Sequence, residues 1–185
     1  KSEEKSYKHI DYRSDITDSS ECLVTYIIAN NPCIHRVVEL LKDVAISSKL
    51  YINKDVIIDG NGYTITASGT NRLFRINDSA KTGNAANVVF NGVQLIGSAG
   101  ANNGGIYFQN TAKSGKLAFV SCKIEKMNTF VKYIVDGAKT NVVIDKCHIS
   151  YVGQFIVWTT KSMESVKVVN SYVDGATCGT IANSA

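Results

Sequence analysis

The stretch "NVVIDKCHIS", residues 141–150, is echoed upstream by "KLAFVSCKIEK" (116–126) and downstream by "SVKVVNSYVDG" (165–175). Two earlier phrases, "DVIID" (55–59) and "NVVFNGVQLIG" (87–97), follow the same pattern. Aligned on the central apolar residues Ile58, Phe90, Phe119, Ile144 and Val168, the phrases are 32, 29, 25 and 24 residues apart. Self-similarity at a period of roughly 20–50 residues predicts a solenoid.

Each phrase alternates apolar with polar residues and is rich in Val, Ile and Phe, which is typical of β-strands. A second apolar segment follows each phrase, and the loops between them are rich in Gly, Ser, Ala and Asn. Because each short strand buries only one face, successive coils must stack to close a core. The sequence therefore predicts an all-β parallel solenoid. The second segments are "RLFRIND" (72–78), "GGIYFQN" (104–110), "FVKYIVDG" (130–137), "QFIVWTT" (154–160) and "CGTIANS" (178–184).

Stacking places equivalent residues of neighbouring coils about 4.8 Å apart, in continuous ladders. Nearly every position expected to point inward is apolar or small, which supports the alignment. The four inward ladders are Val56–Val88–Leu117–Val142–Val166, Ile58–Phe90–Phe119–Ile144–Val168, Val93–Cys122–Cys147–Ser171 and Leu95–Ile124–Ile149–Val173.

The segment "INKDVIIDGNGYTI" (52–65), followed by repeated N-V-x-I-x-x-C-x-I phrases, resembles the right-handed parallel β-helix of the pectin-lyase-like superfamily. The resemblance covers roughly residues 34–185. It implies a right-handed parallel β-helix but no single function. The superfamily includes polysaccharide lyases and hydrolases, phage tailspikes, adhesins and bacterial surface proteins.

The N-terminal region is expected to close one end of the solenoid. Residues 1–17 are polar and predict an arm or linker, and residues 18–185 form the β-helix domain. Within that domain, residues 18–31 predict a capping helix that starts at Asp18 with Glu21 three residues later, and residues 34–185 form the coils. No similar cap follows "GTIANSA", so we expect either that the solenoid continues beyond it or that another chain covers the last coil.

Composition narrows the range of functions. The net charge of +4 is small and dispersed, which argues against a nucleic-acid partner. No apolar run approaches the length of about 18 residues that a membrane span needs. The five cysteines include no C-x-x-C pair and have no histidine at ligand spacing, so no metal site is expected.

Gln94, Lys123, His148 and Tyr172 occupy equivalent outward positions of successive coils. An amide, an ammonium, an imidazole and a phenol in one row can hydrogen-bond sugar hydroxyls, and Tyr172 can stack on a sugar ring. We interpret this row as a candidate binding site for a polysaccharide or cell-surface glycan. A random row of polar residues on an exposed strand is the alternative.

The candidate catalytic residues are Glu125, Asp174 and His148. Glu125, Ser150 and Asp174 are expected on the outer surface, and two coils separate the carboxylates by about 10 Å, near the spacing in inverting glycosidases. His148 beside Lys123 could serve as a base. Solvated turn carboxylates are the alternative, and they are also expected for Asp59 and Asp145, three coils apart. Lyases of the resembled superfamily place acidic calcium ligands beside a basic residue, so calcium is expected only if the chain is a lyase.

The cysteines and the second strand segments leave two structural questions open. Cys122 and Cys147 occupy equivalent positions, so they form either a disulfide or a ladder of small buried thiols, while Cys22 and Cys33 could staple the capping helix. If Lys132 points outward, Tyr133 and Trp158 point inward. An apolar patch then lies outside and suggests a trimer or a flanking domain; the alternative is the reverse strand phase. That patch would comprise Phe130, Ile134, Phe155 and Val157.

These observations favour a non-catalytic attachment or carbohydrate-recognition module of a larger surface or virion protein, located outside the cell. The first alternative is a polysaccharide lyase or glycoside hydrolase. The second is a structural spacer.

Overall fold

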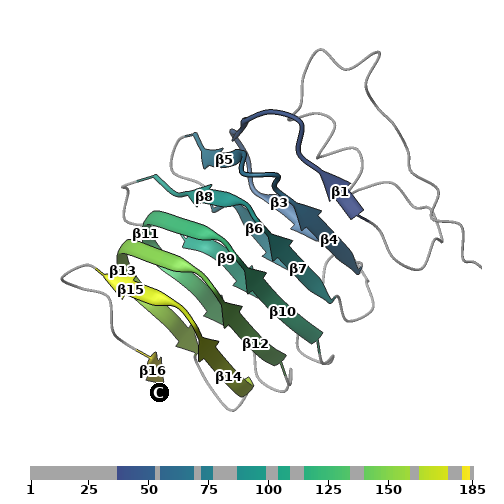
Figure 1. Ribbon diagram of the computed structural model, residues 1–185. Helices are drawn as coiled ribbons and strands as arrows, with labels where there is room; N and C mark the ends of the chain where they lie inside the picture. Colours follow the sequence, from purple (N-terminus) through teal and green to yellow (C-terminus); the bar gives the residue numbers. More distant parts are fainter. Residues whose placement is uncertain are drawn as a thin grey trace, which may run out of the picture.

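The computed structural model describes residues 37–52, 55–68, 72–76, 87–98, 104–108, 115–133, 140–158, 163–174 and 181–183. Every pairing between the strands of this part of the chain is parallel, and the strands of successive coils lie side by side (Figure 1). The predicted all-β parallel solenoid is therefore confirmed. The expected arm (1–17) and capping helix (18–31) lie outside the described residues.

The coils have three sides. The first side is a six-stranded sheet, and the other two belong to one ten-stranded sheet. The second and third sides are continuous because two long strands, β11 and β13, run along both. They bend at Lys126 and Tyr151, where φ is 60° and 52°.

The first side consists of β1 (Val37–Glu39), β4 (Val56–Asp59), β7 (Val88–Asn91), β10 (Gly115–Val120), β12 (Thr140–Asp145) and β14 (Met163–Val169). The second consists of β2 (Val44–Ile46), β5 (Thr64–Ala67), β8 (Gln94–Ile96), the starts of β11 (Lys123–Tyr133) and β13 (His148–Trp158), and β15 (Tyr172–Asp174). The third consists of β3 (Leu50–Ile52), β6 (Phe74–Ile76), β9 (Gly104–Phe108), the ends of β11 and β13, and β16 (Ile181–Asn183).

The register of the strands confirms the predicted ladders. On the first side Phe119 is paired with Phe90 on one neighbouring strand and with Ile144 on the other. On the second side Ile124 is paired in the same way with Leu95 and Ile149. These six side chains are fully buried in one continuous core. The inward expectation is wrong for Val168 and Val173 in the coil after Ile144 and Ile149, where the side chains are 41% and 38% exposed.

A row of aromatic rings runs through this core. Phe90 and Phe119 stack with their ring centroids 5.2 Å apart and their planes at 6°. Phe74 lies 5.0 Å from Phe90, and Phe130 lies 4.7 Å from Phe119. Phe155 extends the row, 5.9 Å from Phe130. The rings therefore tie the first side of the solenoid to the third.

The predicted exposed apolar patch on the third side is wrong. Phe130, Phe155 and Val157 are all buried. Their neighbours Val131 and Ile156 are buried as well, so neither strand phase describes this segment. Strict alternation therefore does not hold on this side, where Phe130 and Val131 are consecutive and both buried, as are Phe155, Ile156 and Val157. Ile134 lies outside the described residues, as do the side chains of Tyr133 and Trp158.

Left-handed residues mark the bend between the first and second sides. Gly92, Ser121, Lys146 and Asn170 occupy it in four successive coils, with φ between 50° and 59°. Asn61, with φ of 48°, lies in the equivalent bend of an earlier coil. Only glycine adopts this conformation without steric cost, and asparagine tolerates it better than other residues. The same backbone turn is thus repeated coil after coil, which keeps the strands that follow it in register.

Candidate functional site

A row of outward side chains crosses the second side just after this bend. The register pairs Lys123 with Gln94 and with His148, and His148 with Tyr172. Thr64 precedes Gln94 in the same row. The predicted row Gln94–Lys123–His148–Tyr172 is therefore contiguous, with side chains about 4.8 Å apart along the solenoid. We call these five residues the outer row.

Main-chain hydrogen bonds hold the row in place. The amide N–H groups of Gln94, Lys123, His148 and Tyr172 each donate to a main-chain carbonyl oxygen of the preceding coil, whereas the Thr64 amide donates to Asp43 Oδ1. The distances are 3.1 Å for Lys123, 2.9 Å for His148 and 2.8 Å for Tyr172. A rigid backbone of this kind reduces the ordering cost when a ligand binds to the side chains.

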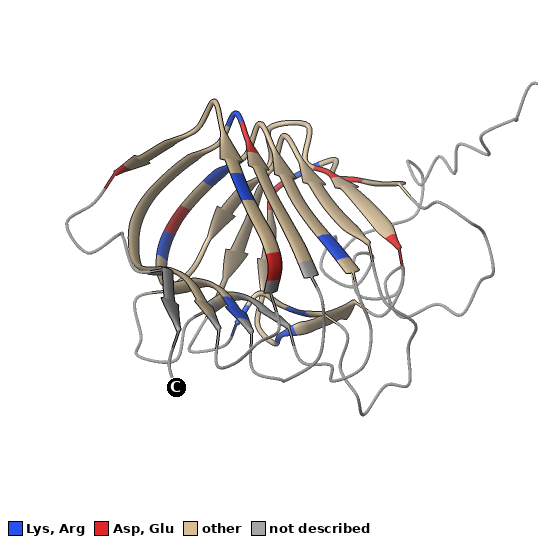
Figure 2. Ribbon diagram, turned by 90° about the horizontal axis from the view of Figure 1, so that it is seen from below, with Lys and Arg blue, Asp and Glu red and all other residues tan. Residues whose placement is uncertain are grey.

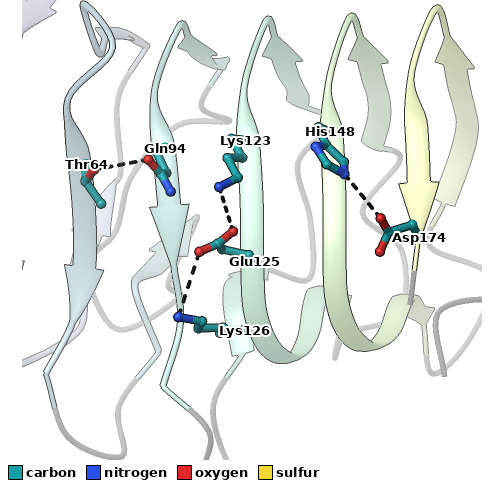
Figure 3. Close-up of polar contacts among 7 residues, drawn as sticks. All are labelled: Thr64, Gln94, Lys123, Glu125, Lys126, His148 and Asp174. Atoms are coloured by element: carbon teal, nitrogen blue, oxygen red, sulfur yellow. Dashed lines mark hydrogen bonds and ion pairs between the residues drawn. The ribbon is translucent and has the colours of Figure 1, made fainter. Parts of the chain in front are cut away.

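Lys123 belongs to a cluster of charges in the middle of the row. Its Nζ lies 3.0 Å from Glu125 Oε2, and Lys126 Nζ lies 4.0 Å from the other carboxylate oxygen (Figure 3). The Glu125 side chain is only 13% exposed, whereas both lysine side chains are about half exposed. The two ammonium groups therefore cover the carboxylate, and the cluster carries one net positive charge toward solvent.

His148, Tyr172 and Asp174 form the C-terminal end of the row. His148 Nε2 lies 3.5 Å from Asp174 Oδ2 (Figure 3). The rings of His148 and Tyr172 are 5.2 Å apart at an angle of 60°. Tyr172 is 63% exposed. An exposed phenol beside an imidazole and a carboxylate offers one ring for stacking and several hydrogen-bonding groups.

The other end of the row is uncharged. Thr64 Oγ1 donates a hydrogen bond of 3.4 Å to Gln94 Oε1, and both side chains are partly exposed (Figure 3). The outer row thus passes from neutral polar groups, through a cationic cluster, to an aromatic end.

The candidate catalytic carboxylates lie on the same side but contact different partners. Glu125 and Asp174 are each in register with Ser150, one strand away on either side. Glu125 is held by two lysines, whereas Asp174 faces His148. Ser150 was expected on the outer surface, and that expectation is wrong, because this short side chain is buried between its longer neighbours.

Asp59 and Asp145 share a ladder on the first side and are three strands apart. Asp145 Oδ1 accepts a hydrogen bond of 3.0 Å from Asn170 Nδ2. Asp59 Oδ1 accepts one of 3.4 Å from the amide of Asn61. Both carboxylates thus accept hydrogen bonds from residues of the bend, which agrees with their interpretation as turn carboxylates.

Cys122 and Cys147 are buried free thiols, as in the thiol-ladder interpretation. Their ladder also carries hydrogen bonds that the sequence pattern did not reveal. The amide of Cys122 donates to Cys147 Sγ at 3.4 Å, and the amide of Cys147 donates to Ser171 Oγ at 3.0 Å. The hydrogen bond with Cys147 and burial raise the pKa of the Cys122 thiol, which stays protonated at neutral pH. Cys22, Cys33 and Cys178 lie outside the described residues.

Two residues of this side were not singled out from the sequence. Thr64 was missed because its phrase, "NGYTI", aligns less closely with the later repeats. Tyr151 is 72% exposed and has a left-handed backbone, at the same bend as Lys126. A bulky residue rarely adopts this conformation, and such strain is concentrated at functional sites. The sequence signal for Tyr151 was its position. It directly follows Ser150, a small residue, which itself follows the inward Ile149.

The described residues contain no group of three or more His, Cys, Asp or Glu side chains placed to hold a metal ion. In the same part of the chain, no helix is long and apolar enough to cross a membrane.

The three-sided stack defines this chain as a parallel β-solenoid with one polar row along its second side. Comparisons with known protein families, curated proteins and solved structures found no match.

Proposed function

We propose that this chain is a non-catalytic carbohydrate-binding module of a larger surface or virion protein. The observation that supports this proposal is the outer row, in which Gln94, Lys123, His148 and Tyr172 follow one another on adjacent strands. One coil adds about 4.8 Å along the axis, roughly the length of one sugar ring in an extended glycan. A glycan lying along the axis could thus place one sugar against each side chain.

The chemistry of the row suits a glycan. Amide, ammonium and imidazole groups can exchange hydrogen bonds with hydroxyls, and the exposed ring of Tyr172 offers a flat apolar face. We further propose that the solenoid is a right-handed β-helix of the pectin-lyase-like type, since a parallel crossover is right-handed in almost all proteins. The proposal also includes an extracellular location. It further includes either assembly into a homotrimer or packing against a flanking domain.

A polysaccharide-cleaving enzyme is the second candidate function. Glu125 and Asp174 are two strands apart, so their backbones are about 10 Å apart, close to the carboxylate spacing of inverting glycosidases. The binding module is preferred because Glu125 already contacts two lysines. Each oxygen of that carboxylate faces an ammonium group, Lys123 on one side and Lys126 on the other, which leaves neither oxygen directed at a substrate.

A glycan array probed with the whole protein tests the binding function. We expect a defined set of glycans to bind, and Tyr172→Ala and His148→Ala to weaken that binding at least tenfold. Lys116→Ala, on the first side, is the matched control and should leave binding unchanged. Binding that both outer-row variants leave untouched would remove the outer row as the site.

The same glycans distinguish the module from an enzyme. Incubation with the protein, with and without calcium, should release no reducing or unsaturated sugar ends. Steady release that is lost in Glu125→Gln or Asp174→Asn would establish the enzyme instead.

A further inference from the structure

Tyr151 is the most exposed large hydrophobic or aromatic side chain of the described residues, and it is not part of the outer row. The side chain is 72% exposed, against 63% for Tyr172. Its φ of 52° places a bulky residue in the left-handed region, and such strained residues are concentrated at functional sites. An exposed aromatic ring on a strained backbone is therefore a candidate for contact with a ligand.

Strand β13 connects Tyr151 to the outer row. His148, at the start of β13, belongs to the row, and Tyr151 lies three residues further along the strand, which corresponds to about 10 Å. This length is about twice the coil spacing of 4.8 Å or so, and hence roughly two sugar rings. Between the two residues, Ile149 points into the core and Ser150 is short and buried. β13 thus leads from the outer row to Tyr151 with no long outward side chain of its own in between.

A carboxylate borders this path along β13. Asp174 is in register with Ser150 and extends toward β13, where its Oδ2 lies 3.5 Å from His148 Nε2 (Figure 3). The Asp174 side chain is 42% exposed, so its other oxygen can accept hydrogen bonds from hydroxyl groups. A ligand that lies along β13 would therefore meet an acceptor between His148 and Tyr151.

The charged groups on the opposite border are directed away from β13. Lys126 occupies the same bend as Tyr151 one coil earlier, and Figure 3 shows its side chain extended toward the strand of Gln94. Its Nζ lies 4.0 Å from Glu125 Oε1. In the view of Figure 2, the Lys, Arg, Asp and Glu positions are isolated segments on mostly tan strands. The surroundings of Tyr151 therefore favour an uncharged sugar.

We propose that the glycan bound by the outer row is branched, and that Tyr151 binds the end of a neutral branch about two sugars long. This inference rests on the proposed function and adds to it the class of glycan. The main chain follows the outer row along the solenoid axis, and the branch leaves it at His148 and follows β13. The first branch sugar exchanges hydrogen bonds with Asp174, and the second stacks on the ring of Tyr151. A tyrosine ring offers a rigid contact surface at a small cost in side-chain entropy.

A glycan array that contains linear and branched members of each backbone tests this inference on the whole chain. Cello-oligosaccharides, with xyloglucan oligosaccharides that carry single-xylose or galactosyl-xylose branches, form one such series; linear mannans and galactomannans form another. We expect the branched members of the bound series to bind more tightly than the linear one. Tyr151→Ala should weaken binding of the branched glycans at least fivefold and leave the linear one within twofold, whereas Tyr151→Phe should retain most of the affinity.

Tyr151→Asn separates binding from stability. Asparagine tolerates the left-handed backbone but has no ring, so this variant should be at least as stable as wild type in thermal unfolding. It should nevertheless lose the preference for branched glycans. Lys116→Ala, on the first side, is the control and should change neither quantity.

The possible results distinguish this inference from the proposed function. If Tyr172→Ala weakens binding but branched and linear glycans bind equally well, the branch site is overturned and the outer row stands. The same conclusion follows if the Tyr151 variants bind like wild type, or if Tyr151→Ala weakens branched and linear glycans equally. An array on which no glycan binds overturns the proposed function, and this inference with it.

Discussion

The amide N–H of Cys122 donates to the sulfur of Cys147 in the next coil, 3.4 Å away. One coil further, Ser171 Oγ accepts from the amide of Cys147 at 3.0 Å and donates to the Val169 carbonyl at 2.7 Å. The ladder thus satisfies buried main-chain donors at the bend. Cysteine and serine perform the same task, because each offers an acceptor atom one bond beyond Cβ.

Replacing Cys147 tests this task. Cys147→Ala should lower the free energy of unfolding by about 1–3 kcal/mol, because it leaves the buried amide of Cys122 without an acceptor. Cys147→Ser keeps an acceptor and should cost clearly less. Urea unfolding measures both variants, and an alanine variant as stable as the serine variant would show that the hydrogen bond contributes nothing.

The Phe119 ring should dominate the stability of the middle coils. It stacks on Phe90 and contacts Phe130, so Phe119→Ala should cost about 3–5 kcal/mol. The matched control is Val168→Ala in the same ladder, where the side chain is 41% exposed and the cost should stay below about 1.5 kcal/mol. Similar losses in the two variants would argue against a core centred on Phe119.

Replacing Lys146 by asparagine should stabilise the folded protein. The φ of 54° at Lys146 places a lysine in the left-handed region, at a cost of about 1 kcal/mol. Asn170 occupies the same bend one coil later, so Lys146→Asn should raise the melting temperature by a few degrees. Lys167→Asn within β14 is the control and should lower it, because asparagine is unfavourable in strands. A rise in the control or a fall at Lys146 would contradict the bend assignment.

The thiol of Cys122 should make stability depend on alkaline pH. Its pKa is raised in the folded protein, so above the unfolded thiol value of 9.0 the unfolded chain releases a proton that the folded chain keeps. Its contribution to stability is complete below pH 9 and falls as the pH rises further. The pKa of Cys147 is lowered by its hydrogen bond with Cys122, which offsets part of this fall. Cys122→Ala should therefore lose less stability than wild type between pH 8 and pH 10. Equal losses in urea titrations at the two pH values would contradict the buried, protonated thiol.

The ladders could be predicted from the sequence because stacking makes one apolar position recur at each coil, as Phe90, Phe119 and Ile144 do. The outer row followed from the same alignment. Phe130 and Phe155 could not be placed, because their phase was inferred from Lys132 by simple alternation. In the structure Phe130 and Val131 are both buried, as are Phe155, Ile156 and Val157, so no strictly alternating phase describes this segment.

The partners of charged side chains could not be predicted from the sequence either. Glu125 is two residues from Lys123 and adjacent to Lys126, and alternation along a straight strand would separate it from one of them. The bend at Lys126 brings both ammonium groups to the same carboxylate. Local backbone geometry thus decided whether Glu125 resembled a catalytic acid or an ion-pair partner.

Nuclear Overhauser spectra of protein labelled in Phe rings and Ile methyl groups test the vertical stacking of the repeats most directly. We expect strong contacts from the Phe119 ring to the Ile144 methyl group and to the Phe90 ring, because the register pairs all three. Spectra in which Phe119 contacts neither residue would contradict the stacked coils, and with them the outer row.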